Sequence, residues 1–173
     1  PLLQVGQRQS VDGLGNVSKS VCVGVAVLKS VWKSADPNAV LFTLSIHEDI
    51  PADISPTGYS MPGEILWMGT FDGLAGEFVP QIWAEGIEEG WMEPPEWYEF
   101  PGDHVCWQYN FFIDEADAFY QQGSPDNPVV YWLDVQAEPL DQGAWFGWKT
   151  SIDHWNDDAV WGYGPEPYPG PWF

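Results

Sequence analysis

The sequence is poor in positive charge. Only five of its 173 residues are Lys or Arg, against 26 Asp and Glu, and its formal net charge is -21. A nucleic-acid-binding surface needs Lys and Arg to displace counterions from phosphates, so an ordinary nucleic-acid binder is excluded. An anionic membrane surface is an equally poor partner for such an acidic chain.

Long apolar runs and cysteines are also scarce. No apolar stretch approaches the ~20 residues that span a bilayer, so we expect no membrane span. The two cysteines, Cys22 and Cys106, fall in strand-like runs and predict one disulfide between strands, with two buried thiols as the alternative. Because the chain starts at Pro1 rather than Met and holds few lysines, we expect an exported, extracellular protein.

Motifs of enzymes are missing as well. The three histidines, His47, His104 and His154, form no HxH or HxxxH pair, which leaves a zinc site without support. Neither a G-x-S-x-G elbow nor a phosphate-binding loop occurs. Carboxylates are so abundant that an acid/base pair is not a specific signal, and we therefore predict no enzymatic activity.

What the sequence does contain is a series of short alternating segments. Hydrophobic residues make up 45% and charged residues 18%, which is typical of one globular domain. Apolar and polar residues alternate with period two between clusters of Gly, Pro, Asp and Asn, and no segment has a helical period. This pattern predicts an all-β, two-sheet antiparallel sandwich, jelly-roll-like, with long acidic Trp/Pro-rich loops at 51–62 and 83–104. The candidate strands are 21–33, 40–47, 64–71, 77–84, 105–113 and 129–136.

Three of these strands alternate clearly enough to assign their faces. In each of them one face is apolar. The apolar faces are Phe42, Leu44 and Ile46; Val105, Trp107, Tyr109 and Phe111; and Val129, Tyr131, Leu133 and Val135. The first strand places Thr43, Ser45 and His47 opposite, and the second places Gln108 and Asn110 opposite, so we expect half-buried strands.

Two stretches are dense in oxygen ligands of the kind that calcium prefers, although neither has the EF-hand spacing. We predict a Ca²⁺ site from Asp114, Glu115, Asp117, Asp153, Asp157 and Asp158, or from the segment 85–103. The alternative for the first stretch is a short helix capped by Asp114 and ended by Gly123.

Tryptophan is abundant, with twelve residues. We expect core positions for Trp67, Trp107, Trp132 and Trp148, and exposed positions for Trp83, Trp91, Trp97 and Trp172, which lie among Pro, Gly and Glu. Exposed tryptophans stack on sugar rings and also anchor protein interfaces, so they do not separate glycan binding from assembly.

Charge is unevenly distributed along the chain. Residues 1–33 carry four cations and one acid, a net of +3, whereas residues 34–173 carry a net of -24. Lys149 is the only cation of the acidic body, and we predict a structural ion pair with Asp153 or Asp157. The domain prediction is therefore a basic N-terminal leader, 1–20, on a β-sandwich domain, 21–173.

Three strings support a resemblance: "FTLSIHEDIPADISPTGYSMPGEILW", "VYWLDVQA" and "FGWKTSIDHWNDDAVW". Over residues 21–163 the chain resembles an uncharacterised β-sandwich domain family of secreted, surface-anchored or multidomain proteins from planctomycete-type bacteria. The resemblance implies secretion and a β-sandwich, and it implies no catalytic residues.

The ends of the chain depart from that family. Its members continue into a last apolar strand, whereas this chain ends in "WGYGPEPYPGPWF" and adds the leader. A sandwich that lacks a strand has a groove that a neighbour's segment can fill. We therefore predict a self-assembling extracellular subunit of a filament or tube, stabilised by calcium, whose assembly arm is Leu2, Leu3, Val5 and Arg8. The alternative is a secreted carbohydrate-binding module.

Overall fold

The computed structural model describes residues 3–10, 20–30, 36–93, 97–124, 126–148 and 159–162, with only the backbone described for the first two ranges. Within these ranges the chain forms antiparallel strands and no helix. No helix among the described residues is therefore long and apolar enough to cross a membrane. The strands are β1 (Leu3–Ser10), β2 (Ser20–Ser30), β3 (Val40–Ile50), β4 (Met61–Asp72), β5 (Phe78–Glu93), β6 (Trp97–Phe112), β7 (Gly123–Ser124), β8 (Asn127–Pro128), β9 (Val130–Pro139), β10 (Ala144–Trp148) and β11 (Val160–Gly162).

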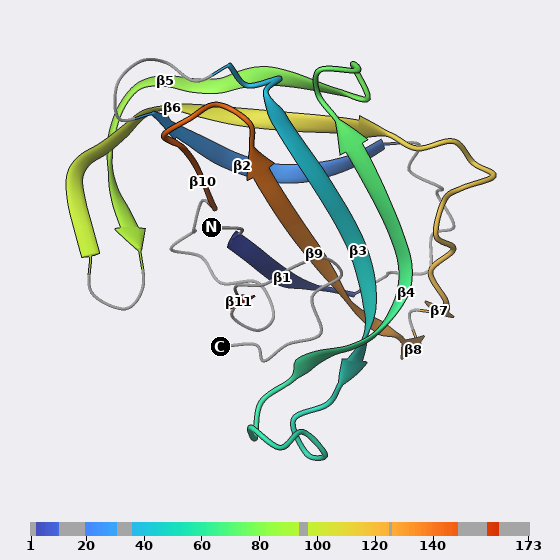
Figure 1. Cartoon of the computed structure of the whole chain (residues 1–173). Helices are drawn as coiled ribbons and strands as arrows, with labels where there is room; N and C mark the ends of the chain where they lie inside the picture. The colour runs from blue at the N-terminus through green and yellow to red at the C-terminus, as the bar shows by residue number, and fades with distance from the viewer. Residues whose placement is uncertain are drawn as a thin grey trace.

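Two main sheets pack against each other. One has the order β11-β1-β9-β3-β4 and the other the order β10-β2-β6-β5, while β7 and β8 form a small separate ladder. The strands of the two sheets cross at a steep angle (Figure 1). Consecutive hairpins β3–β4 and β5–β6 lie within a main sheet, whereas β1–β2, β2–β3, β4–β5, β9–β10 and β10–β11 connect the two main sheets. The predicted two-sheet antiparallel sandwich is confirmed.

The core between the sheets is built on aromatic rings. Phe42 of β3 lies at its centre, with ring centroids of Phe78, Tyr109, Phe111 and Phe146 between 4.9 and 5.3 Å away. All four partners come from the opposite sheet, so this one side chain joins the two layers. Edge-on ring pairs of this kind each add about 0.5–1.5 kcal/mol to the burial of their surface.

The predicted apolar faces of β3, β6 and β9 are the faces that point into this core. Tyr109 and Phe111 are buried, and so are Leu133 and Val135. Trp107 packs against the same core from a partly buried position. Period-two alternation therefore assigned the inward faces of these strands correctly.

Two segments predicted to lie outside the sheets are strands. The predicted loop 83–104 is mostly the outer half of the β5–β6 hairpin. Its register shifts at three places, and Gly86 has a φ of 67°, a left-handed conformation that suits glycine. These irregularities and the density of Glu, Gly and Pro hide the strand pattern in the sequence. The predicted leader contains β1, which is an inner strand of the five-stranded sheet.

Candidate functional site

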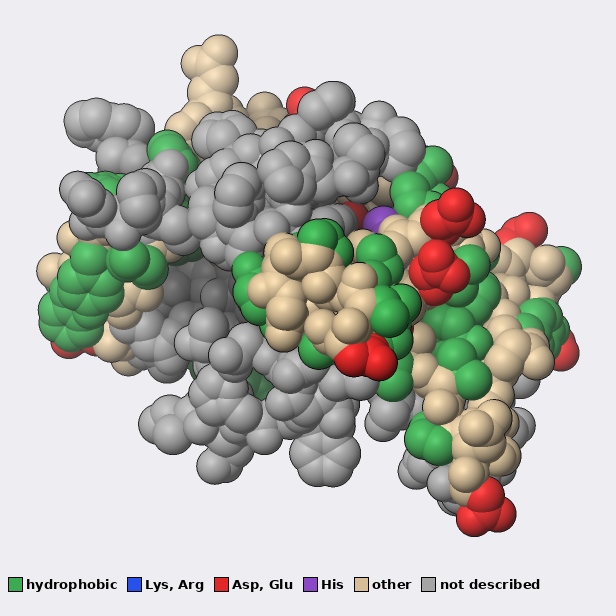
Figure 2. Space-filling model, turned by 90° about the horizontal axis from the view of Figure 1, so that it is seen from below, with side chains coloured by type: hydrophobic (Ala, Val, Ile, Leu, Met, Phe, Trp, Pro, Cys, Tyr) green, Lys and Arg blue, Asp and Glu red, His purple; other side chains and the backbone are tan. Residues whose placement is uncertain are grey.

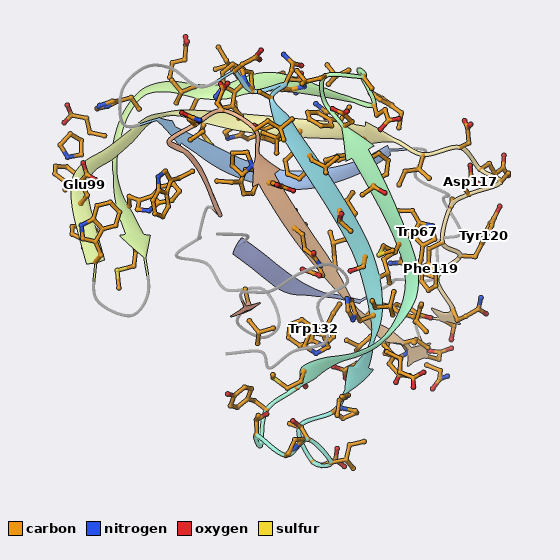
Figure 3. The ribbon with its side chains drawn as sticks, in the orientation of Figure 1. Trp67, Glu99, Asp117, Phe119, Tyr120 and Trp132 are labelled. Carbon is orange, nitrogen blue, oxygen red and sulfur yellow. The ribbon has the colours of Figure 1, made fainter. Side chains whose placement is uncertain are left out.

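The outward face of β3 and β9 is buried, which the sequence reasoning did not foresee. The small polar side chains that alternate with the core residues are all at most 1% exposed. The set comprises Thr43, Ser45, His47, Asp134 and Gln136. Farther along β9, Trp132 packs with Met61 and Val160 (Figure 3). The indole N–H of Trp132 donates to Asp49 Oδ1 at 2.8 Å.

Hydrogen bonds link these polar side chains across two strands. Ser45 Oγ lies 2.9 Å from His47 Nε2 and 3.2 Å from Asp134 Oδ2. Gln136 Nε2 donates to the same carboxylate oxygen at 2.8 Å. His47 Nδ1 lies 2.9 Å from the carbonyl oxygen of Gly63, which can only accept, so Nδ1 carries the proton.

The protonation of His47 follows from its surroundings. Burial lowers the pKa of His47, and the hydrogen bond to the Gly63 carbonyl opposes that shift. The neutral ring therefore accepts a hydrogen bond from the Ser45 hydroxyl at Nε2. If His47 gains a proton, Nε2 becomes a donor to Ser45, and the hydroxyl is then released to donate to Asp134.

This group of Ser, His and Asp does not have the geometry of a nucleophilic triad. In such a triad a carboxylate holds the Nδ1 proton, but here a backbone carbonyl holds it. Asp134 Oδ2 instead lies 3.9 Å from Nε2. Because all three side chains are fully buried, they suit a role in fixing the register of β3 on β9.

The first predicted calcium stretch is a turn rather than a helix. The Asp117 N–H donates to the Asp114 carbonyl at 2.9 Å, and no helix follows. Trp67 of β4 donates its indole N–H to the Asp117 carbonyl at 2.6 Å, and the Tyr120 hydroxyl donates to the Glu115 carbonyl at 3.2 Å. Figure 3 shows this segment running beside β4. Backbone carbonyls of the stretch therefore tie the end of β6 to the neighbouring sheet.

No group of three or more His, Cys, Asp or Glu side chains that could hold a metal ion occurs in the described part of the chain. Asp114, Glu115 and Asp117 are all exposed. The other predicted ligands, Asp153, Asp157 and Asp158, lie outside the described residues, as does Lys149, so the calcium site and the ion pair stay predictions.

The strand register argues against the predicted disulfide. Cys22 of β2 is paired with Asn110 of β6, four residues along the strand from Cys106. Four residues of a strand span roughly 13 Å, whereas bridged cysteines have Cα atoms within about 7 Å. Cys106 is buried in the structure. The two cysteines therefore lie on adjacent strands of one sheet but at different positions along them.

The exposed tryptophans are only partly as predicted. Trp83 and Trp97 are exposed, but Trp91 is buried, at 7% exposure. The ring of Trp91 covers Gly147 of β10, where an added Cβ would lie 2.6 Å from two of its ring atoms. Trp172 lies outside the described residues, as does the side chain of Trp148. Of the expected core tryptophans, Trp132 is fully buried, and Trp67 and Trp107 are partly buried.

The first strand fills a slot in the five-stranded sheet. β1 pairs with β9 over eight residues, from Leu3 opposite Ala137 to Ser10 opposite Val130, and with β11 on its other side. The predicted arm residues Leu3, Val5 and Arg8 all belong to this strand, and Leu2 lies outside the described residues. In the structure β1 pairs with β9 and β11 of its own chain, and the domain boundary at residue 20 stays a prediction.

The five Lys and Arg side chains lie outside the described side chains. Seen from below in Figure 2, Asp and Glu lie among exposed hydrophobic side chains.

None of the curated proteins matches the chain, and none of the solved structures does. Residues 27–172 match the model of a domain of unknown function, DUF7901, and because the match spans most of the sequence, the chain belongs to this family.

Proposed function

We propose that this protein is an extracellular structural subunit that self-assembles into a filament or tube, with β1 of one subunit engaging its neighbour. The observation that carries the proposal is the position of β1. It is the first strand of the chain, yet it is an inner strand of the sheet, hydrogen-bonded to β9 and β11 and not to β2, the next strand in sequence.

A strand that is joined to the rest of its domain by a connecting segment can be exchanged between identical chains. Every subunit offers the same strand and the same slot, so a β1 from a neighbour reproduces the eight pairs with β9. Nine residues, 11–19, join β1 to β2, and nine extended residues reach at most roughly 30 Å. Exchange in one direction along a row of subunits does not close on itself, and it therefore produces a filament.

The family match supports a separate role for this strand. The matched residues begin at 27, inside β2, so β1 lies outside the part of the chain that defines the family. The same N-terminal region is basic, whereas the rest of the chain has a net charge of -24. Packing such bodies together requires counter-charge, for which calcium bound by carboxylates remains our proposal.

A cysteine pair across β1 and β9 tests the proposal directly. Ser10 and Val130 are paired in the register, and paired residues of antiparallel strands have Cα atoms about 4.5–5.5 Å apart, which suits a disulfide. The variant Ser10→Cys/Val130→Cys is oxidised under conditions of assembly and run on non-reducing gels. Strand exchange predicts a ladder of disulfide-linked chains, and electron microscopy of the same sample shows whether filaments are present.

Two controls make the result specific. Wild-type protein treated with the same oxidant reports the background from Cys22 and Cys106. In Ser10→Cys/Leu133→Cys the second cysteine is three residues along β9 and on its other face, so no bond is expected. If Ser10→Cys/Val130→Cys gives only a cross-linked single chain, β1 stays in its own subunit and the proposal fails.

A further inference from the structure

The β5–β6 hairpin extends beyond the rest of its sheet. Among the described strands β2 pairs with β6 only from Trp107 to Phe112, so the part of β6 before Trp107 has β5 as its sole partner. Register shifts in this outer half bend it away from the sheet (Figure 1). We call residues 85–103 the hairpin arm.

One face of the hairpin arm is anchored to its own domain. The ring of Trp91 covers Gly147 of β10, and the Trp91 backbone lies against Gly102, where an added Cβ would come within 2.5 Å of the Trp91 Cβ. The rings of Trp97 and Trp145 lie 6.3 Å apart. These contacts hold the arm at a fixed position, so its other face is presented as a preorganised surface.

The other face of the hairpin arm is apolar and open to solvent. Met92 and Tyr98 are directly paired across the two strands, and Phe100 follows two residues along β6. They are 56%, 61% and 60% exposed. The Tyr98 ring lies over Gly90, where an added Cβ would contact it closely. Figure 2 shows hydrophobic side chains exposed at the left edge, where the hairpin lies. Methionine and aromatic residues of this kind are enriched at protein interfaces.

Acidic residues are abundant in the hairpin arm that carries this apolar face, and we call these residues its acidic rim. The arm contains six Glu and Asp103 and no Lys or Arg, a net charge of -7. Glu85 and Glu88 are exposed on β5. Because methionine and aromatic side chains are enriched at protein interfaces, we take a protein as the occupant of this face. The acidic rim selects a basic protein surface, and residues 1–33, with a net charge of +3, are the basic part of this chain.

We propose that Met92, Tyr98 and Phe100, with the acidic rim of the hairpin arm, dock on the basic N-terminal region of a second copy. The contact joins two different surfaces, so it is head-to-tail and continues from copy to copy. This inference rests on the proposed self-assembly and adds the surface that receives the neighbour.

The apolar part of the contact is tested with Tyr98→Ser/Phe100→Ser. Both side chains are exposed, so the fold should remain intact, which circular dichroism verifies. Sedimentation velocity should show self-association weakened by at least about tenfold, as for residues central to an interface. The matched control is Leu74→Ser, in the turn between β4 and β5, because Leu74 is 66% exposed and lies off the arm. Its self-association should equal that of the wild type.

The identity of the partner is tested by exchanging charges. Glu85→Lys/Glu88→Lys should weaken self-association, and Lys19→Glu/Lys33→Glu added in the same chain should restore it. Failure to restore it, or a wild-type protein that stays monomeric, overturns the second copy as occupant. Binding of the wild type, but not of Tyr98→Ser/Phe100→Ser, to insoluble polysaccharide in a pull-down would also overturn it in favour of a saccharide.

These outcomes are separate from those of the strand-exchange experiment. If the disulfide ladder of Ser10→Cys/Val130→Cys persists when Tyr98 and Phe100 are replaced by Ser in the same chain, exchange of β1 stands and docking of the arm fails. If self-association depends on the arm but the oxidised protein remains a cross-linked single chain, docking stands and exchange of β1 fails.

Discussion

Gly147→Ala tests how the hairpin arm is held. Gly147 has no left-handed φ, so alanine is compatible with its backbone, and the nearest described atoms that a new methyl group would meet belong to the Trp91 ring. An ideal Cβ at this position lies 2.6 Å from both Cη2 and Cζ3 of that ring. Non-bonded carbons prefer a separation of about 3.5–4.0 Å, so the ring has to move by about 1 Å.

The cost of this movement is set by packing on both sides of the ring. The Trp91 backbone is held against Gly102, so the side chain cannot withdraw freely. Overpacking of a filled site typically costs about 1–3 kcal/mol, which we expect for Gly147→Ala. Trp91→Phe removes the outer edge of the indole and leaves a cavity, with a cost of similar size.

A double-mutant cycle separates this clash from other effects. Phenylalanine lacks the ring atoms that meet the new methyl group, so the double variant should be less destabilised than the sum of the single variants by at least about 1 kcal/mol. Urea unfolding followed by tryptophan fluorescence gives the three free energies. Additive costs within about 0.5 kcal/mol would falsify the proposed contact between Trp91 and Gly147.

Three other predictions follow from buried groups and from charge. The Tyr109 hydroxyl is buried and has no hydrogen-bond partner among the described residues. Burial, and to a smaller extent the charge of Asp36, raises the pKa of Tyr109, so the hydroxyl stays neutral. Tyr109→Phe should therefore raise the free energy of unfolding by about 1–2 kcal/mol in urea titrations, and a loss of stability would contradict this. Burial lowers the pKa of His47 in the folded state, so below its unfolded value of 6.5 the unfolded chain binds an extra proton and stability falls. In the wild type this lowers the free energy of unfolding by up to about 1.4 kcal/mol for each pH unit below 6.5, and His47→Gln should remove that dependence on pH. The control His104→Gln, at an exposed position, should retain the pH dependence of the wild type. Chelation with EGTA at fixed ionic strength should shorten the assemblies seen by electron microscopy, and added calcium should restore them; unchanged length would remove calcium from the mechanism.

The sequence was most informative where strands alternate regularly. Phe42, Tyr109 and Val135 were placed on inward faces by period two alone, and all three are buried. The alternation of apolar and polar residues could not show that Ser45 and Asp134, on the opposite face, are buried as well. Small polar side chains suit either water or a hydrogen-bonded interior, and only their partners from another strand decide between the two.

Contacts between distant segments were beyond the reach of the sequence. Trp91 and Trp97 lie in similar Glu- and Pro-rich surroundings, yet Trp91 is buried because the bent hairpin brings it onto Gly147. The register argues against the disulfide for a related reason, since pairing and not composition decides which residue of β6 lies opposite Cys22 of β2. Sequence by itself determined the acidic charge, the all-β class and the core faces, because these depend on composition and local period. Tertiary structure alone decided that β1 fills an inner slot, since strand pairing joins residues more than a hundred positions apart.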